Sequence, residues 1–279
     1  MSTKRNNHRH AYIKHKDLVS GAYLPTKKPL NEVAIIIAQG AINPGDAGKR
    51  RFHEATVNFG IPVFIPDYYG HSRSNGKFSP KNCAKTITDM IDFLKKGAEF
   101  YDLSKNGSTR YNFKDVLVIG YSFGAWVPWY INHFFPNKKM DRFGLISPFI
   151  DFKNQATREF PKEQSIQSFL REGRKIYKNI YRGMEDPIWD TFLFAKEKKF
   201  DPMRNLKSIS ENKIAIIHGE KDTVINCKKS VNLHKKLLEL NPQNKKLKIF
   251  PSIAHDGDLL ATQGGMTFLL NHLLGKNNY

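Results

Sequence analysis

A serine stands between two glycines in the pentapeptide GYSFG at residues 120–124, directly after the apolar run VLVI. This G-x-S-x-G pattern is typical of a nucleophile elbow, a turn from a buried strand into a helix that is too sharp for side chains beside the serine. The N-terminus of that helix would favour negative charge that develops near the Ser122 hydroxyl. The alternative interpretation, an N-cap serine that only starts a helix, predicts no partners at the ends of later strands.

Two such partners follow along the chain. Asp222 lies in the loop just past an expected strand at 213–219, and His255 lies in the loop just past the last expected strand, at 247–251. In a parallel sheet these loops open on the same edge, so residues far apart in sequence converge on one site. The chain order Ser, Asp, His is the one expected with this motif. The pattern predicts that His255 takes the proton of Ser122 and later gives it to the leaving group, while Asp222 holds the tautomer of the imidazole and stabilises the imidazolium.

Each partner also has an ordinary structural interpretation. Asp222 precedes a threonine, as a turn-forming aspartate does, and His255 taken alone is a histidine in a surface loop. Together with the elbow they favour the catalytic interpretation, because each stands where the geometry of a triad demands it. The competing groups are His218, Asp256 and Asp258. His218 ends a strand and Asp256 adjoins the base, so we expect neither to orient it.

Acyl transfer also needs hydrogen-bond donors for the oxyanion of a tetrahedral intermediate. The backbone N–H of Phe123, the residue after the nucleophile, is one candidate. The second is the backbone N–H of Ala41, which follows Gly40 in the loop after IIIAQ. Gly40 also fits a simple turn, so the assignment of Ala41 depends on the course of that loop.

The elements that must position these residues alternate between strands and helices. Apolar runs such as VAIIIAQ at 33–39 are typical of strands buried on both faces of a parallel sheet. AYIKHK and LVSGAYLP near the N-terminus are expected to form an antiparallel pair at the sheet edge. Further strands are expected at 61–67, 115–120, 141–148, 213–219 and 247–251, and helices at about 47–59, 80–100, 122–135, 227–240 and 264–275. This alternation predicts right-handed crossovers and a doubly wound, mostly parallel α/β sheet.

One long stretch, 151–205, interrupts the alternation. It is rich in Phe, Tyr, Lys and Glu and separates two strands that a single crossover helix would have joined. Long loops without structure are uncommon in compact domains, so we expect a small helical lid here rather than an irregular surface connection. The chain is therefore expected to form one α/β core from 1–150 and 206–279, with a lid insertion at 151–205.

The composition indicates a globular protein, since 40% of the 279 residues are hydrophobic and supply enough apolar surface for a core. A net charge of +19 favours weak attraction to anionic substrates or surfaces, although lysines spread over solvated faces are the simpler interpretation. The two cysteines, Cys83 and Cys227, lie far apart in expected helices, and neither a secretory signal nor a membrane span is found, which favours a cytoplasmic protein. There is no phosphate-binding loop and no metal-spaced Cys/His cluster, so no cofactor is expected.

The sequence resembles the α/β-hydrolase superfamily of serine hydrolases over nearly its whole length. AQG at 38–40 stands where the family usually has HG, with Gln39 in place of the histidine. IPDYYGHSRSNG at 65–76 is similar to the DxxGHGxS stretch of family members, with Ser72 in place of the second glycine. We interpret this segment as a loop that braces the elbow, so His71 is not the expected base.

The insertion resembles the small lids of cinnamoyl and feruloyl esterases, monoacylglycerol lipases and related carboxylesterases. Such a lid typically covers the acyl or aromatic pocket of the enzyme. Seven aromatic side chains in or beside the insertion are therefore expected either to line a pocket or to pack within the lid itself. They are Phe149, Phe152, Phe169, Tyr177, Trp189, Phe192 and Phe194.

These patterns predict a serine hydrolase that cleaves carboxylic esters, with a small-molecule acyl ester as its substrate. Thioesters and amides stay open as substrates of the same fold. A noncatalytic binding protein on a hydrolase scaffold is an alternative, against which the intact Ser, Asp and His set argues. Nucleic-acid binding through the basic excess is another, and no recognition motif supports it. The acyl group, the leaving group and the oligomeric state do not follow from the sequence.

Overall fold

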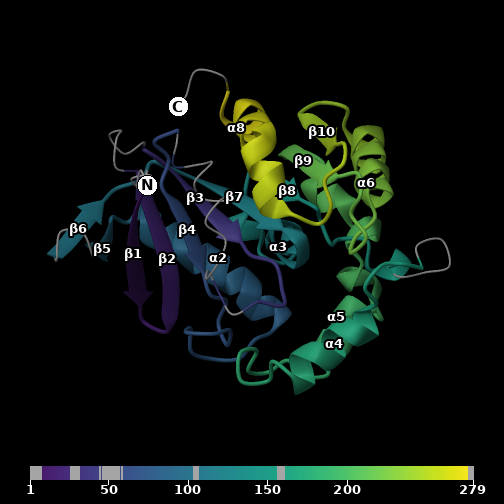
Figure 1. Ribbon diagram of the computed structural model, residues 1–279, viewed down its shortest axis with the longest axis horizontal. Helices are drawn as coiled ribbons and strands as arrows, with labels where there is room; N and C mark the ends of the chain where they lie inside the picture. The colour runs from purple at the N-terminus through teal and green to yellow at the C-terminus, as the bar shows by residue number, and fades with distance from the viewer. Residues whose placement is uncertain are drawn as a thin grey trace, which may run out of the picture.

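The computed structural model describes residues 8–25, 32–43, 45, 57, 59–102, 107–155 and 161–275. Within them the strands form one ten-stranded sheet in the order β10-β9-β8-β7-β3-β4-β2-β1-β5-β6 (Figure 1). Neighbouring strands from β10 to β4 are parallel, and those from β4 to β6 are antiparallel. The expected doubly wound, mostly parallel sheet is therefore confirmed. The strands are β1 His8–His15, β2 Leu18–Pro25, β3 Val33–Ala38, β4 Val63–Pro66, β5 Ala98–Asp102, β6 Gly107–Tyr111, β7 Asp115–Tyr121, β8 Arg142–Ile146, β9 Lys213–Gly219 and β10 Lys245–Phe250.

The central parallel strands are buried on both faces, as their continuous apolar runs predict. In β3, Ala34 and Ile36 belong to one core cluster, whereas Ile35 and Ile37 belong to the other. This division arises because successive side chains of a strand point to opposite faces of a sheet. Each face of the sheet must therefore be covered by helices.

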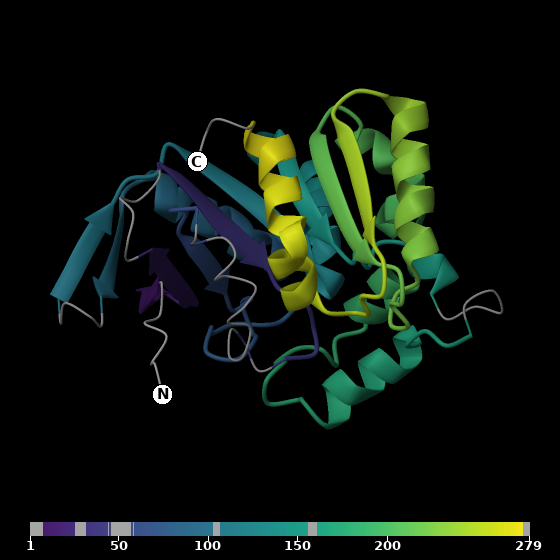
Figure 2. The ribbon, with the colours of Figure 1, turned by 45° about the horizontal axis from the view of Figure 1, so that its top comes forward.

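Helices α2, α3 and α6 contribute to the first core cluster, and α8 contributes to the second. Figure 2 shows α8 lying across the front of the sheet. Of the described helices, none is long and apolar enough to span a bilayer. Their bounds are α2 Pro80–Lys95, α3 Trp126–Phe134, α4 Ile166–Lys175, α5 Ile188–Leu193, α6 Cys227–Leu240, α7 Gly257–Leu260 and α8 Met266–Leu274.

The segment after α2 differs from the expectation. The helix expected over 80–100 ends at Lys95, and Gly97, with a φ of +90°, leads the chain into β5. β5 pairs with β6 as a hairpin and with β1 on its other side, so the β1–β2 pair lies inside the sheet and β6 forms its edge. The error has a physical cause. Leu94 and Ala98 continue the helical spacing, whereas the pairing of β5 with β1 is a long-range contact that no local pattern contains.

Two other expected helices have different outcomes. The one over 47–59 lies almost wholly outside the described residues. The one at about 264–275 is present as α8, and it is preceded by α7 and a kink at Ala261–Gly265, where Gly264 has a φ of +88°.

Between β8 and β9 the chain leaves the sheet over the stretch expected to form a lid. Its described part contains α4, α5 and several short 3-10 helices, and Figure 2 shows α4 beneath the edge at which the parallel strands end. Trp189 and Phe192 of α5 are buried in the same core cluster as α2 and α3, and Trp189 Nε1 donates to the carbonyl of Phe78 at 3.0 Å. The insertion is therefore helical and anchored to the core, while its function as a lid stays a prediction.

Candidate active site

The turn after β7 has the shape of a nucleophile elbow. Ser122 has a φ of +51°, in a region that is strained for a residue with a side chain. A Cβ on Gly120 would lie 2.6 Å from Ala125 Cα, and one on Gly124 would lie 2.1 Å from the carbonyl oxygen of Ala38. Side chains are therefore excluded at both glycines, which is the physical reason for the G-x-S-x-G spacing.

The side chains of Ser122, His255 and Asp222 form one hydrogen-bonded chain at the carboxyl edge of the sheet. His255 Nε2 lies 2.9 Å from Ser122 Oγ, and His255 Nδ1 lies 2.6 Å from Asp222 Oδ2. An ionised carboxylate only accepts hydrogen bonds, so Nδ1 carries the proton. Nε2 is then free to accept the hydrogen bond of the serine hydroxyl, which is the arrangement that a general base requires.

Asp222 is almost completely buried, yet it accepts four hydrogen bonds. Its Oδ1 accepts from the backbone N–H groups of Val224 and Ile225 at 2.9 and 2.8 Å. Its Oδ2 accepts from His255 and, at 3.0 Å, from His218. Burial by itself would raise the pKa of Asp222, but the hydrogen bonds from the two histidines outweigh burial and hold that pKa below its usual value. The carboxylate therefore stays charged where it meets the imidazole.

His218 also belongs to this site, although the sequence analysis predicted no role for it. It is fully buried, and its Nε2 faces both Asp222 Oδ2 and, at 2.9 Å, the carbonyl oxygen of Ile225. Both partners are acceptors, so Nε2 must carry a proton; Nδ1 lies 2.7 Å from the hydroxyl of Ser230. Both histidines thus contact Asp222, and the described hydrogen bonds of His218 do not include His255. The four-residue spacing between His218 and Asp222 at the end of a strand was the signal that would have found it.

The imidazole of His255 has further neighbours. The ring of Tyr121 stacks against it with centroids 5.7 Å apart. Asp256, the competing acid beside it, instead accepts the backbone N–H of Leu259 at 2.9 Å and caps α7. Asp256 therefore has a structural role in starting a helix.

The two predicted oxyanion donors lie beside the serine. Ala41 and Phe123 line the same cavity as Ser122 and His255. A Cβ on Gly40 would lie 3.2 Å from Ser122 Cβ, so the loop after β3 passes directly beside Ser122. A side chain at position 40 would therefore crowd Ser122, which favours glycine here beyond any role in a turn.

The loop that carries Ala41 is held in place by Asn43. The carbonyl of Asn43 accepts hydrogen bonds from His71 Nε2 at 2.9 Å and from the Tyr181 hydroxyl at 3.0 Å, while its N–H donates to that hydroxyl at 2.7 Å. The rings of His71 and Tyr181 stack at 4.6 Å. Burial lowers the pKa of His71, which favours the neutral ring. His71 and the insertion thus brace the loop beside the nucleophile.

Gln39, which replaces the usual histidine, is turned toward the neighbouring strand. Its side-chain Nε2 donates to the carbonyl of Pro66 at 2.7 Å, and its backbone carbonyl accepts from the Tyr68 hydroxyl at 2.9 Å. The side chain is buried. Gln39 therefore ties the end of β3 to the end of β4.

A cavity of about 210 Å³ opens at Ser122. Most of the side chains around it are apolar, as in sites for small organic ligands. They include Phe123, Phe149, Ile166, Phe169, Val224 and Ile225. Of the aromatic residues singled out in the insertion, Phe149 and Phe169 line this cavity. Phe152, Trp189 and Phe192 are buried in the core, and Tyr177 and Phe194 pack against it.

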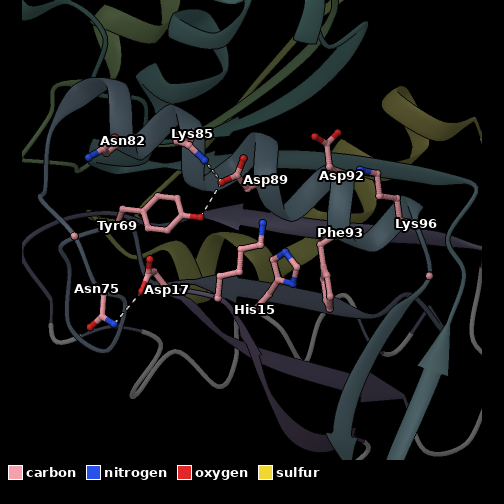
Figure 3. A pocket seen from close by; sticks show the side chains of 13 residues that line it. His15, Asp17, Tyr69, Asn75, Asn82, Lys85, Asp89, Asp92, Phe93 and Lys96 are labelled. Atoms are coloured by element: carbon pink, nitrogen blue, oxygen red, sulfur yellow. Dashed lines mark hydrogen bonds and ion pairs between the residues drawn. The ribbon is translucent and has the colours of Figure 1, made fainter.

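A second cavity, of about 620 Å³, is lined by residues that all differ from those around Ser122 (Figure 3). Its polar groups pair with one another. Asp89 accepts the Tyr69 hydroxyl at 2.7 Å and pairs with Lys85, and Asn75 donates to Asp17 at 3.1 Å. In the part of the chain that the structure describes, no group of three or more His, Cys, Asp or Glu residues is arranged to hold a metal ion.

No protein-family model and no curated protein matches the sequence. Solved structures do match the fold. An esterase from Pyrococcus furiosus is 17% identical, with a TM-score of 0.59, and the match covers 96% of this chain and 93% of that one. Carboxyl esterase 2 from Tuber melanosporum is 13% identical, with a TM-score of 0.65 and coverage of 100% and 88%. A monoacylglycerol lipase from Paleococcus ferrophilus is 15% identical, with a TM-score of 0.57 and coverage of 91% and 99%. The chain therefore has the α/β-hydrolase fold that its sequence predicts.

Proposed function

We propose that this protein hydrolyses carboxylic esters through an acyl-enzyme intermediate, with Ser122 as the nucleophile, His255 as the general base and Asp222 as the acid that orients it. One observation carries the proposal: the imidazole of His255 makes hydrogen bonds of 2.9 Å to the serine and 2.6 Å to the carboxylate. The names of structurally similar proteins, among them esterases and a lipase, agree with this reaction.

In the first half of the reaction, Ser122 Oγ attacks the ester carbonyl carbon while His255 Nε2 takes the hydroxyl proton. The carbonyl π bond opens and gives a tetrahedral oxyanion, for which the backbone N–H groups of Phe123 and Ala41 are the proposed donors. The imidazolium then protonates the leaving alkoxide as the C–O bond breaks. The alcohol departs and the acyl group remains on Ser122.

In the second half, water takes the place of the alcohol. His255 removes a proton from the water, whose oxygen attacks the acyl carbon, and the Ser122 ester bond breaks as the imidazolium returns the proton to Oγ. The products are a carboxylic acid and the free enzyme. Asp222, with its pKa held below the usual value, supplies the fixed negative charge that stabilises the imidazolium in both halves.

The first test combines turnover with covalent labelling. Wild-type protein should hydrolyse p-nitrophenyl butyrate and should gain the mass of one phosphonyl group when treated with a serine-directed phosphonate, measured as intact mass. Ser122→Ala should lose the label, and its kcat should fall by a factor on the order of 10⁴ or more. Ser252→Ala, which alters an exposed serine in the same loop as His255, is the control and should behave as wild type.

The same assay separates the alternatives. Panels of matched thioesters and amides show whether the ester is the preferred substrate, because all three pass through the same acyl-enzyme. Wild-type protein that neither takes the phosphonate label nor turns over any of the three would count against the catalytic proposal. That result would favour a binding protein on a hydrolase scaffold.

A further inference from the structure

Two segments that are distant in sequence form part of the wall of the cavity at Ser122. One belongs to the insertion and includes Gln155, Gln164 and Phe169; the other is the loop after β9, with Val224 and Ile225. The size of the cavity depends on how firmly these two segments are held together. Their junction is therefore the part of the molecule that decides which acyl groups fit.

The junction is a cluster of polar contacts behind the cavity wall. Gln155 Nε2 donates to the carbonyls of Gln164 at 3.0 Å and Val224 at 2.9 Å. Gln155 Oε1 in turn accepts from Lys229 Nζ, 2.8 Å away on α6. We call Gln155, Glu163 and Lys229 the polar seam.

Glu163 closes the polar seam from the other side. Its Oε2 pairs with Lys229 Nζ at 2.5 Å, and its Oε1 accepts the backbone N–H of Asn226 at 2.6 Å. The side chains of Lys229 and Glu163 are only 3% and 2% exposed. To part the two segments, the protein would have to separate this buried ion pair, which is strongly unfavourable because each charge would be left uncompensated. The wall of the cavity is therefore preformed and resists widening.

The volume of the cavity limits what it holds. A benzene molecule, with six carbons, occupies an apolar cavity of about 150 Å³. On that scale a cavity of about 210 Å³ holds about eight carbon-sized atoms, among them those of the ester group. We infer that the substrates are esters of short apolar acyl chains of about four to six carbons, and that the polar seam sets the upper limit. This inference rests on the proposed ester hydrolysis.

The first experiment measures kcat/KM for p-nitrophenyl esters from acetate to laurate. Wild-type protein should prefer butyrate or hexanoate and should lose activity on laurate by a factor on the order of 100, since excess methylenes find no room in a fixed cavity. Equal kcat/KM values for butyrate and laurate would overturn the size limit. Absence of hydrolysis at every chain length, together with absence of phosphonate labelling, would instead overturn the proposed function itself.

The second experiment loosens the polar seam. The double variant Glu163→Gln with Lys229→Met removes both charges at similar volume, and it should raise the ratio of laurate to butyrate activity by about tenfold. Gln155→Met, which removes the hydrogen bonds between the two walls at similar side-chain volume, should move the ratio in the same direction and serves if the double variant folds poorly. Arg174→Met is the matched control, because it breaks an ion pair with Asp190 within the same insertion but outside the polar seam.

The variants are first compared by thermal unfolding, so that chain-length profiles are read only from folded protein. A ratio that rises in every folded seam variant and stays at the wild-type value in Arg174→Met supports the inference. A ratio that stays unchanged in a folded seam variant, or rises equally in Arg174→Met, shows that the polar seam does not set the limit.

Discussion

At the scale of single residues, the central feature is a buried carboxylate that remains charged. Asp222 achieves this because two backbone N–H groups and two imidazoles donate to it. His255 uses one of these contacts for the proposed chemistry, whereas His218 contacts Asp222 but neither Ser122 nor His255 among the described hydrogen bonds. We therefore interpret His218 as a positioning residue that acts through Asp222.

This interpretation predicts different effects for two substitutions of His218. His218→Leu removes a donor to Asp222 and should lower kcat for a short ester by about 10- to 100-fold with little change in KM. His218→Gln keeps an N–H donor near the position of Nε2 and should retain most of the activity. If His218 had only a structural role, the two variants would instead have equal kcat values once their stabilities are matched.

The pH profile of kcat/KM adds a second measurement. The pKa of Asp222 is depressed in the folded protein, so its charge is present at ordinary pH and is lost only as the pH falls through that low value. Loss of the His218 donor raises the pKa of Asp222 and moves the loss of charge to higher pH. On the acid side of the profile, kcat/KM of His218→Leu should therefore fall at a higher pH, and more steeply, than kcat/KM of wild type. An unchanged acid side would contradict the proposed coupling.

At the scale of elements, the insertion touches the proposed oxyanion loop through Tyr181. Its hydroxyl makes hydrogen bonds with both the N–H and the carbonyl of Asn43, close in sequence to Ala41. The insertion thus contributes to the geometry of the proposed oxyanion loop as well as to the cavity. A small change in the position of an oxyanion donor affects the transition state more than substrate binding.

Tyr181→Phe should therefore reduce kcat by about tenfold while KM changes little, because a loosened donor stabilises the oxyanion less. The control is Tyr177→Phe, which alters a half-buried tyrosine of the same insertion whose hydroxyl takes no part in the contacts of Asn43. Steady-state kinetics on p-nitrophenyl butyrate provide the measurement. Equal kcat values for the two variants would show that Tyr181 does not position the loop.

At the scale of the whole molecule, the net charge of +19 creates a positive field that attracts anions over long distances. Salt screens such a field, with a Debye length of about 10 Å at 0.1 M ionic strength. If the field steers substrates, kcat/KM for an ester with a carboxylate in its leaving group should fall about threefold or more as sodium chloride is raised from low to moderate concentration. The matched neutral ester should change little. The same salt dependence for both esters would exclude steering of the substrate.

Much of the architecture followed from local patterns along the chain. Apolar runs predicted the buried parallel strands β3, β7, β8 and β9, since only a sheet covered on both faces buries both sides of a strand. The glycines of GYSFG predicted the sharp turn at Ser122. The positions of Asp222 and His255 in loops at strand ends predicted that they meet the serine, because parallel strands bring such loops to one edge.

What the sequence by itself determined was thus the order of elements and the loops that meet at one edge of the sheet, both of which arise from periodicity and chain direction. The tertiary structure alone decided the β5–β6 hairpin, the contact of His218 with Asp222, the support of Asn43 by Tyr181 and the polar seam behind the cavity. The pairing of the hairpin with β1, the Tyr181 contact and the seam join segments far apart in sequence, and their residue types fit a solvated surface equally well. The contact of His218 with Asp222 is local, but only the fold turns both side chains inward and buries them together. Burial selects these partners, because a polar group removed from water must find a hydrogen bond wherever the fold provides one.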